Sequence, residues 1–145
     1  MTILQPPDWP QPVGYASGIS AQGTLVFVSG QIGWDTAGRF ASGDIAGQVE
    51  QALRNVVAVV AEAGGTPADI VRLTWFVTDK AAYVSGRKAI GTAYRRVMGR
   101  HFPAMSVIAV SALVEDAALV EIEATAVVNG GAAGGRTAPG GTIGG

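Results

Sequence analysis

The alternation of polar and apolar positions predicts strands in five segments of the chain. In residues 71–77, apolar side chains occupy every second position, which is the period at which one face of a β-strand is buried. Residues 25–29, 107–114 and 119–128 are rich in apolar and β-branched side chains, which is typical of strands. Residues 15–20 complete the set. Because the connections are short, we expect 15–20 to form a hairpin with 25–29, and 107–114 to form another with 119–128.

Two other segments repeat their apolar residues at the three- and four-residue spacing of a helix. The first follows Asp44, whose carboxylate suits an N-cap, and it ends at Gly64. The second follows Asp79 and contains Gly86 and Gly91, which lower its helix propensity. The predicted order of elements is β-β-α-β-α-β-β, and the fold class is α+β.

The predicted sheet carries more apolar surface than the two helices can cover. Right-handed crossovers place both helices on one face, yet the strand at 119–128 is apolar in both of its phases. We therefore expect another subunit against the open face. Residues 1–128 are predicted to form a single domain that begins with an extended arm over 1–14, and residues 129–145 a glycine-rich flexible tail.

Composition supports an oligomer and argues against several partners. Of the 145 residues, 48% are hydrophobic and only 14% are charged, whereas about 25% is the usual charged share. A net charge of −1 gives no field that would attract nucleic acid or an anionic membrane. The sequence has no cysteine, no secretory leader pattern and no long apolar run. We expect a cytoplasmic protein that binds neither nucleic acid nor a membrane.

Several kinds of catalytic chemistry find little support. His101 is the single histidine, so a serine–histidine–acid triad would depend on it, and a zinc site would need carboxylates for its other ligands. Next to Phe102, this histidine is interpreted as a turn or interface residue, and no metal site is predicted. The basic pairs Arg87–Lys88 and Arg95–Arg96 have the spacing of a solvated helix face.

One acidic pair has a candidate role. Glu121 and Glu123 lie two residues apart in a strand, so both carboxylates project from the same face. Their neighbours are almost all apolar. From the pattern alone, these glutamates belong either to an exposed edge or to a site that uses a carboxylate.

Several motifs together resemble one family. They occur in order across about 15–128, and the chain is identified by them as a divergent member of the RidA (YjgF) family of imine and enamine deaminases. The motifs are Val26-Phe-Val-Ser-Gly-Gln-Ile32, Gln48-Val-Glu-Gln-Ala-Leu-Arg-Asn-Val56, Ala63-Gly64, Val71-Arg-Leu-Thr-Trp-Phe-Val-Thr-Asp79, Phe102-Pro-Ala-Met-Ser106 and Val120-Glu-Ile-Glu-Ala-Thr-Ala126.

The resemblance implies a fold, an assembly and a reaction. The fold is chorismate-mutase-like, the assembly is a homotrimer with sites between subunits, and an imine or enamine is hydrolysed without metal or cofactor. Glu121 matches the glutamate that activates the attacking water. Tyr15, Gly30 and Pro103, with Ala104 after it, match residues that line the pocket.

The chain departs from the family pattern at the substrate grip. Met105 stands where deaminating members have an arginine that binds the substrate carboxylate, and a thioether cannot replace that bond. The loss weakens binding by at least about 1.5–3 kcal/mol. Val107 replaces a polar or sulfhydryl residue, and Gly91 an asparagine. Trp34 either covers the core or forms a pocket wall.

Two functions stay open at this point. One is a deaminase whose substrate is more apolar than 2-iminopropionate, such as 2-aminomuconate. Its anion would then be held by another arginine, with Arg39, Arg72 and Arg100 as candidates. The alternative is a non-catalytic trimer that binds a small molecule or a partner protein in its clefts.

Overall fold

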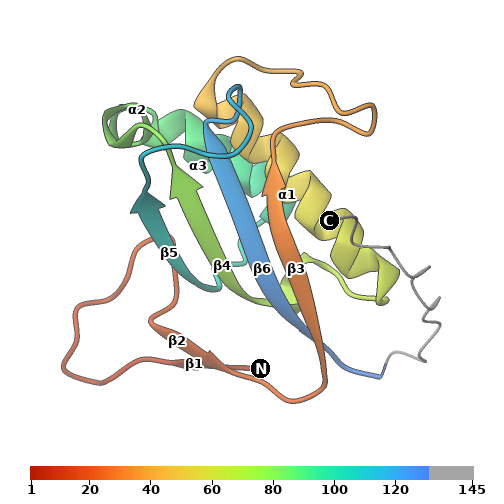
Figure 1. The fold of residues 1–145 in the computed structure, drawn as a ribbon. Helices are drawn as coiled ribbons and strands as arrows, with labels where there is room; N and C mark the ends of the chain where they lie inside the picture. Colours follow the sequence, from red (N-terminus) through yellow and green to blue (C-terminus); the bar gives the residue numbers. More distant parts are fainter. Residues whose placement is uncertain (131–145) are drawn as a thin grey trace.

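A four-stranded sheet backed by helices forms the body of the protein. The computed structural model describes residues 1–130, and residues 131–145, most of the predicted tail, lie outside that range. The strand order is β3-β6-β4-β5 (Figure 1). The strands are β3 (Thr24–Ile32), β4 (Ile70–Val77), β5 (Ala104–Ala109) and β6 (Val120–Val128). The mixed α+β class is therefore confirmed.

The long helix α1 (Ile45–Glu62) begins where its N-cap predicts. The Asp44 carboxylate accepts a hydrogen bond of 2.7 Å from the Gly47 N–H. Gly64, which follows the helix, has a positive φ of +77°. Its buried stripe packs against the sheet and consists of Gln48, Val49, Ala52, Leu53, Val56 and Val60. Both signals predicted from the sequence are confirmed.

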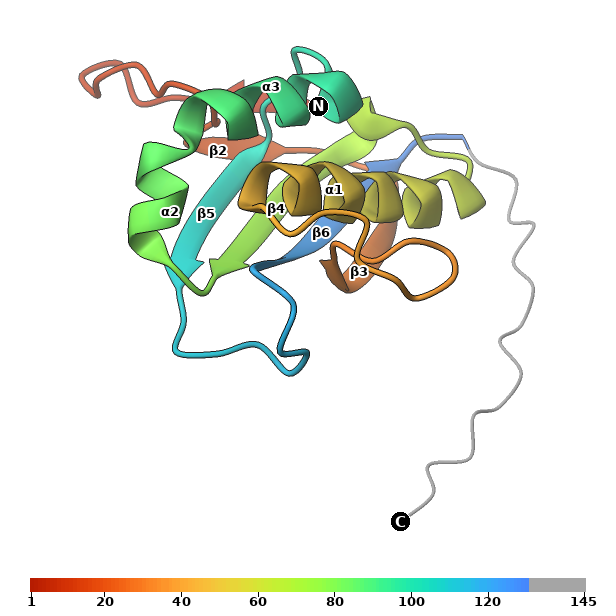
Figure 2. The same ribbon diagram turned by 90° about the horizontal axis from the view of Figure 1, so that it is seen from above.

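The second predicted helix is divided in two. Asp79 caps α2 (Lys80–Ser85) by accepting from the Ala82 N–H, and α3 (Arg87–Met98) follows after Gly86. A Cβ on Gly86 would lie 2.8 Å from the Ala82 carbonyl oxygen, so the bend brings backbone too close for a side chain. Figure 2 shows α2 beside the β5 edge of the sheet.

The first predicted hairpin does not form. The strand β2 (Gly18–Ser20) pairs with β1 (Thr2–Leu4) in a separate two-stranded sheet, and it does not pair with β3. The arm over 1–14 therefore has a strand partner over Thr2–Leu4 and is not a wholly unpaired extended segment. Turn residues before β3 indicated a reversal of the chain, but they did not specify which segment β2 would pair with.

The second predicted hairpin is also wrong. β6 lies between β3 and β4 and is antiparallel to both, while β5 runs parallel to β4 at the sheet edge. Most residues of β6 are buried, and its position between β3 and β4 gives its backbone a hydrogen-bonded partner on both sides. The segment 110–119 therefore crosses from the edge to the centre and is not a tight turn.

One face of the sheet has no helix over it. Figure 1 looks onto this face, with the strands in front and the helices behind. Leu25 and Phe27 of β3 project from it and are 58% and 74% exposed. The expectation of a bare, partly apolar sheet face is confirmed for the chain by itself.

Candidate functional site

The bare face holds the candidate catalytic carboxylate. Glu121 is half-buried in β6, between the fully buried Val120 and Ile122. The pairing of β3 with β6 shifts register between Val28 and Gln31, as at a β-bulge. Gly30 lies in this irregular stretch, which is therefore the place where the side chain of Glu121 meets the backbone of β3.

Gly30 leaves the space that the Glu121 side chain occupies. A Cβ on Gly30 would lie 2.7 Å from the carboxyl carbon of Glu121 and 2.8 Å from its Cγ. Such contacts are far shorter than van der Waals separation, so the glycine is required for this arrangement. Glu123 projects from the same face but is exposed. The structure thus distinguishes two glutamates that the sequence left equivalent.

A large groove lies on the other face, between the β5 edge and the α2–α3 segment. Its volume is about 1220 Å³, and the arm closes one side of it through Val13, Gly14 and Tyr15. The N–H of Ala16 donates to the carbonyl of Pro103, which holds the arm against the start of β5. The groove has the scale of a small-molecule site.

Aromatic side chains form much of the groove wall. Trp75 stacks on Tyr94 with ring centroids 6.2 Å apart, and Tyr94 stacks on Phe102 at 5.4 Å. Tyr83 meets Trp75 edge-on. The Tyr94 hydroxyl donates to the carbonyl of His101, and burial raises the pKa of this phenol. Trp75 and Tyr94 are buried, so the half-buried Tyr83 and Phe102, which pack against them, present the aromatic surface of the wall.

His101 has a structural role in the chain. Its Nε2 lies 2.7 Å from the carbonyl oxygen of Ile70, and the residue is half-buried beside the turn that leads to β5. This agrees with its interpretation as a turn residue. Within residues 1–130, no three histidine or acidic side chains gather as metal ligands, and no helix is long and apolar enough to cross a membrane.

All the predicted site residues except Trp34 fall into two separate groups. Tyr15, Met105 and Val107 line the groove, and Pro103 is fully buried where its carbonyl accepts from the Ala16 N–H. Met105 pairs with Leu73 of the core, so its side chain faces the helices.

Glu121 belongs to the opposite group. It pairs with Phe76 of β4, which is out of phase with Leu73, and so it faces away from the helices together with Gly30. Within one chain, the carboxylate and Met105 are on opposite faces of the sheet.

Trp34 belongs to neither group. It pairs with Phe40 across the loop that follows β3, with ring centroids 6.3 Å apart, and it is 37% exposed. The Asn55 side chain holds this loop by donating to the Trp34 carbonyl. In the single chain, Trp34 does not line the groove.

Two arginines that the sequence analysis assigned to a solvated helix face line the groove. Arg87 and Arg95 extend from α3 to its rim, and Lys80 lies at the start of α2. The three arginines proposed from the sequence are elsewhere, with Arg39 in an ion pair with Asp35 at 3.6 Å. Projection of residues 87–98 onto a helical wheel would have placed Arg87 and Arg95 on one stripe.

Asp35 organises the loop that carries Arg39. Its carboxylate accepts hydrogen bonds from the backbone N–H groups of Arg39 and Ala37, and these bonds lower the pKa of Asp35 below its ordinary value. The loop is therefore ordered by its own turn, without contribution from the groove.

Comparison with known proteins finds a matching family model and similar proteins over most of the chain. A family model described as endoribonuclease L-PSP matches residues 9–128. A RutC family protein of Haemophilus influenzae is 39% identical over 105 residues, which cover 72% of this chain and 80% of the relative. A 2-iminobutanoate/2-iminopropanoate deaminase of Dermatophagoides farinae is 32% identical over 127 residues, covering 87% and 95%.

A solved structure has the same fold over nearly its whole length. The Rid protein family member YyfB of Yersinia pestis superposes with a TM-score of 0.79 at 30% identity. The match covers 88% of this chain and 98% of that one. The overall fold described above is therefore shared with that protein.

Proposed function

The chain belongs to the RidA (YjgF) family, and from this we propose that it is a deaminase that hydrolyses an imine or enamine. Relatives named as deaminases support an activity of this type at the level of the family. The observation that carries the proposal here is the carboxylate of Glu121, half-buried against Gly30 on a mostly buried strand.

The proposed reaction needs water and one proton-transferring group. The oxygen of water bonds to the carbon of the C=N group while one water proton passes to the carboxylate of Glu121. That proton then moves to nitrogen, the C–N bond breaks, and the remaining hydroxyl proton leaves with the departing ammonia. An imine and water thus become a carbonyl compound and ammonia, with no cofactor or metal needed.

We infer that the active protein is a homotrimer with its sites between subunits. Support comes from the two faces of the sheet, since one chain cannot bring Glu121 and Met105 to the same small substrate. The exposed Leu25 and Phe27 give the bare face an apolar surface that a neighbouring subunit would cover. Glu121 of one subunit would then complete the groove of the next.

The proposed substrate is more apolar than 2-iminopropionate. Met105 and Val107 give the floor of the groove no charge, and aromatic side chains surround it. An unsaturated substrate such as 2-aminomuconate is one example of the class. We propose a cytoplasmic location for the protein, for which the cysteine-free sequence is the support.

Ammonia release tests the proposed reaction. Imines are generated in place by an amino acid oxidase, and their decay is followed with wild-type protein and with Glu121→Gln. The variant is expected to lose about a hundredfold or more of the rate enhancement, as is usual for a general acid–base group. Glu123→Gln, a change of the exposed neighbour, is expected to keep it. Equal rates for wild type and Glu121→Gln over a broad panel would favour a non-catalytic binding protein.

A further inference from the structure

The rim of the groove carries a feature that the proposed reaction does not use. We propose that the rim of α3 around Arg87 and Arg95 is an anion subsite, where one guanidinium binds the carboxylate of a substrate and the other adds to the positive field. The flat apolar group of that substrate lies in the groove. This inference rests on the proposed function for the reaction, but the binding it describes can be measured without turnover. It assigns the substrate class to 2-imino or enamino acids with a large unsaturated substituent.

Arg87, Gly91 and Arg95 follow one another at four-residue intervals on α3. Residues with this spacing lie along one stripe of a helix, and all of them line the groove. Over the eight residues from Arg87 to Arg95 the helix rises by about 12 Å. The stripe therefore presents two guanidinium groups with a gap between them.

Gly91 allows Arg95 to lean back into that gap. A Cβ on Gly91 would lie 3.4 Å from Nη1 of Arg95, and no other atom would lie within 4 Å of it. The guanidinium of Arg95 thus lies over the helix backbone, where a longer side chain at position 91 would displace it. At the other end of the stripe, the guanidinium of Arg87 lies 6.0 Å from the ring centre of Tyr83.

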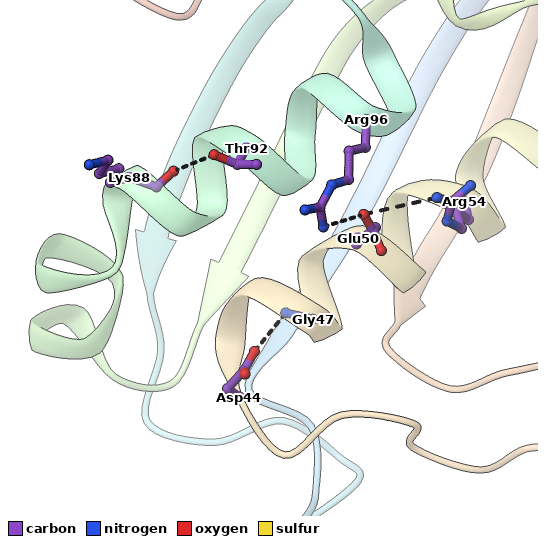
Figure 3. A network of polar contacts seen from close by, with 7 residues as sticks. All are labelled: Asp44, Gly47, Glu50, Arg54, Lys88, Thr92 and Arg96. Atoms are coloured by element: carbon purple, nitrogen blue, oxygen red, sulfur yellow. Dashed lines mark hydrogen bonds and ion pairs between the residues drawn. The ribbon is translucent and has the colours of Figure 1, made fainter.

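The two arginines have no internal counter-charge. In residues 1–130, neither forms an ion pair, and the groove is lined by Lys80, Arg87 and Arg95 without any carboxylate. Arg96, next in sequence to Arg95, points toward α1 and pairs with Glu50 at 3.4 Å (Figure 3). Adjacent arginines therefore differ in that only one of them has its charge compensated.

The groove continues from this cationic rim into an apolar interior. The half-buried Tyr83 and Phe102 line it and pack against the buried Trp75 and Tyr94. Met105 adds a flexible apolar side chain to the same lining. Its volume of about 1220 Å³ exceeds what a three-carbon imino acid fills. A ligand with a carboxylate at one end and a ring or diene at the other matches both parts, because each end meets its complementary surface.

Calorimetric titration with stable analogues tests the subsite directly. The probes are phenylpyruvate, which carries the carboxylate, and phenylacetone, in which a methyl group replaces it. Phenylpyruvate is expected to bind wild-type protein more tightly than phenylacetone. Arg87→Gln and Arg95→Gln are each expected to weaken phenylpyruvate binding by about fivefold to thirtyfold, a moderate loss because both guanidiniums are solvent-exposed.

Two controls make the result specific. Arg96→Gln removes the neighbouring charge that Glu50 already pairs with, and it should leave phenylpyruvate binding unchanged. Phenylacetone should bind all variants as it binds wild type. The subsite is refuted if the Arg87→Gln/Arg95→Gln double variant binds phenylpyruvate normally, or if its affinity for phenylacetone falls in parallel.

The proposed reaction and the subsite can fail separately. If Glu121→Gln releases ammonia as fast as wild type while the arginine variants lose phenylpyruvate, the subsite holds and the deaminase proposal is wrong. If Glu121→Gln is inactive while the arginine variants bind phenylpyruvate normally, the reaction holds and the subsite is wrong.

Discussion

The carboxyl carbon of Glu121 lies 2.7 Å from the point at which a Cβ on Gly30 would stand. The two residues come from β6 and β3, at the place where the register of these strands shifts. The position of the carboxylate therefore depends on the absence of a side chain at residue 30. This dependence comes from space: a side chain at residue 30 and the Glu121 carboxylate would occupy the same volume.

Gly30→Ala is therefore expected to displace the Glu121 carboxylate. We expect the variant to lose activity about as severely as Glu121→Gln, on the order of a hundredfold. Steady-state ammonia release and thermal unfolding are measured together, so that lost activity is separated from lost structure. Gly43→Ala is the control, since a Cβ there meets nothing within 4 Å. Full activity of a folded Gly30→Ala protein would contradict the proposed role of this contact.

The buried Gln48 should contribute strongly to stability. Its side-chain amide donates to the carbonyls of Ser42 and Ala117 and accepts from the N–H of Leu119 at 2.8 Å. Gln48→Leu leaves these backbone groups unpaired, and we expect the free energy of unfolding to fall by about 2–4 kcal/mol.

Urea unfolding measures the effect of Gln48→Leu. Gln51→Leu is a matched control one turn along α1, because the Gln51 amide bonds only the Asn55 side chain among the described residues. It should cost less than about 1 kcal/mol. Since Leu119 leads directly into β6, a loss of activity in Gln48→Leu larger than in Gln51→Leu would indicate that this network also positions Glu121.

The sequence predicted those features that depend on local chemistry. Asp44 and Asp79 were identified as N-caps because a carboxylate there satisfies free N–H groups of the first turn, and both accept the expected bonds. The pairing partners of β2 and β6 were not predictable in this way. A strand's neighbours are decided by which apolar surfaces meet after the chain has folded, and the turn residues of 114–119 carry no such information.

The candidate site was predictable only in part for a similar reason. Motifs identified Glu121, Gly30 and Met105 individually, but their distribution over the two faces of the sheet emerges from the register. Arg87 and Arg95 fit the pattern of a solvated helix face, and they are indeed exposed. Their position beside the groove distinguishes them from other exposed arginines, and the groove cannot be seen in the sequence pattern.

Glycines in α3 should differ in their effect on stability. Gly91→Ala places a Cβ at 3.4 Å from the movable end of Arg95, so the gain in helix propensity should prevail and raise the free energy of unfolding by about 0.5–1 kcal/mol. Gly86→Ala places its Cβ 2.8 Å from a backbone oxygen and should destabilise the protein. Chemical denaturation of both variants tests the pair, and equal effects would contradict this account.

Tyr94 should make stability sensitive to alkaline pH. Burial raises the pKa of its phenol above the ordinary value of 10.0. The folded state therefore retains this proton at a pH where the unfolded state releases it. The stabilising contribution is complete below the ordinary pKa and is lost as pH rises above it.

Denaturation as a function of pH tests this coupling. Between about pH 9 and 11, the free energy of unfolding of wild type should fall more steeply than that of Tyr94→Phe, which has no phenol at this position. The same slope in Tyr94→Phe and wild type would mean that this phenol does not titrate on unfolding in this range.

A mixture of two inactive variants should recover activity if the site is shared between subunits. Glu121→Gln lacks the carboxylate but keeps its groove, whereas Met105→Trp blocks the groove but keeps the carboxylate. After dissociation and random reassembly in equal amounts, about a quarter of the sites should combine the intact half of each variant. Ammonia release near that fraction of the wild-type rate is the expected outcome. If each site lay within one chain, no intact site would arise on mixing, and the mixture would stay as inactive as its components.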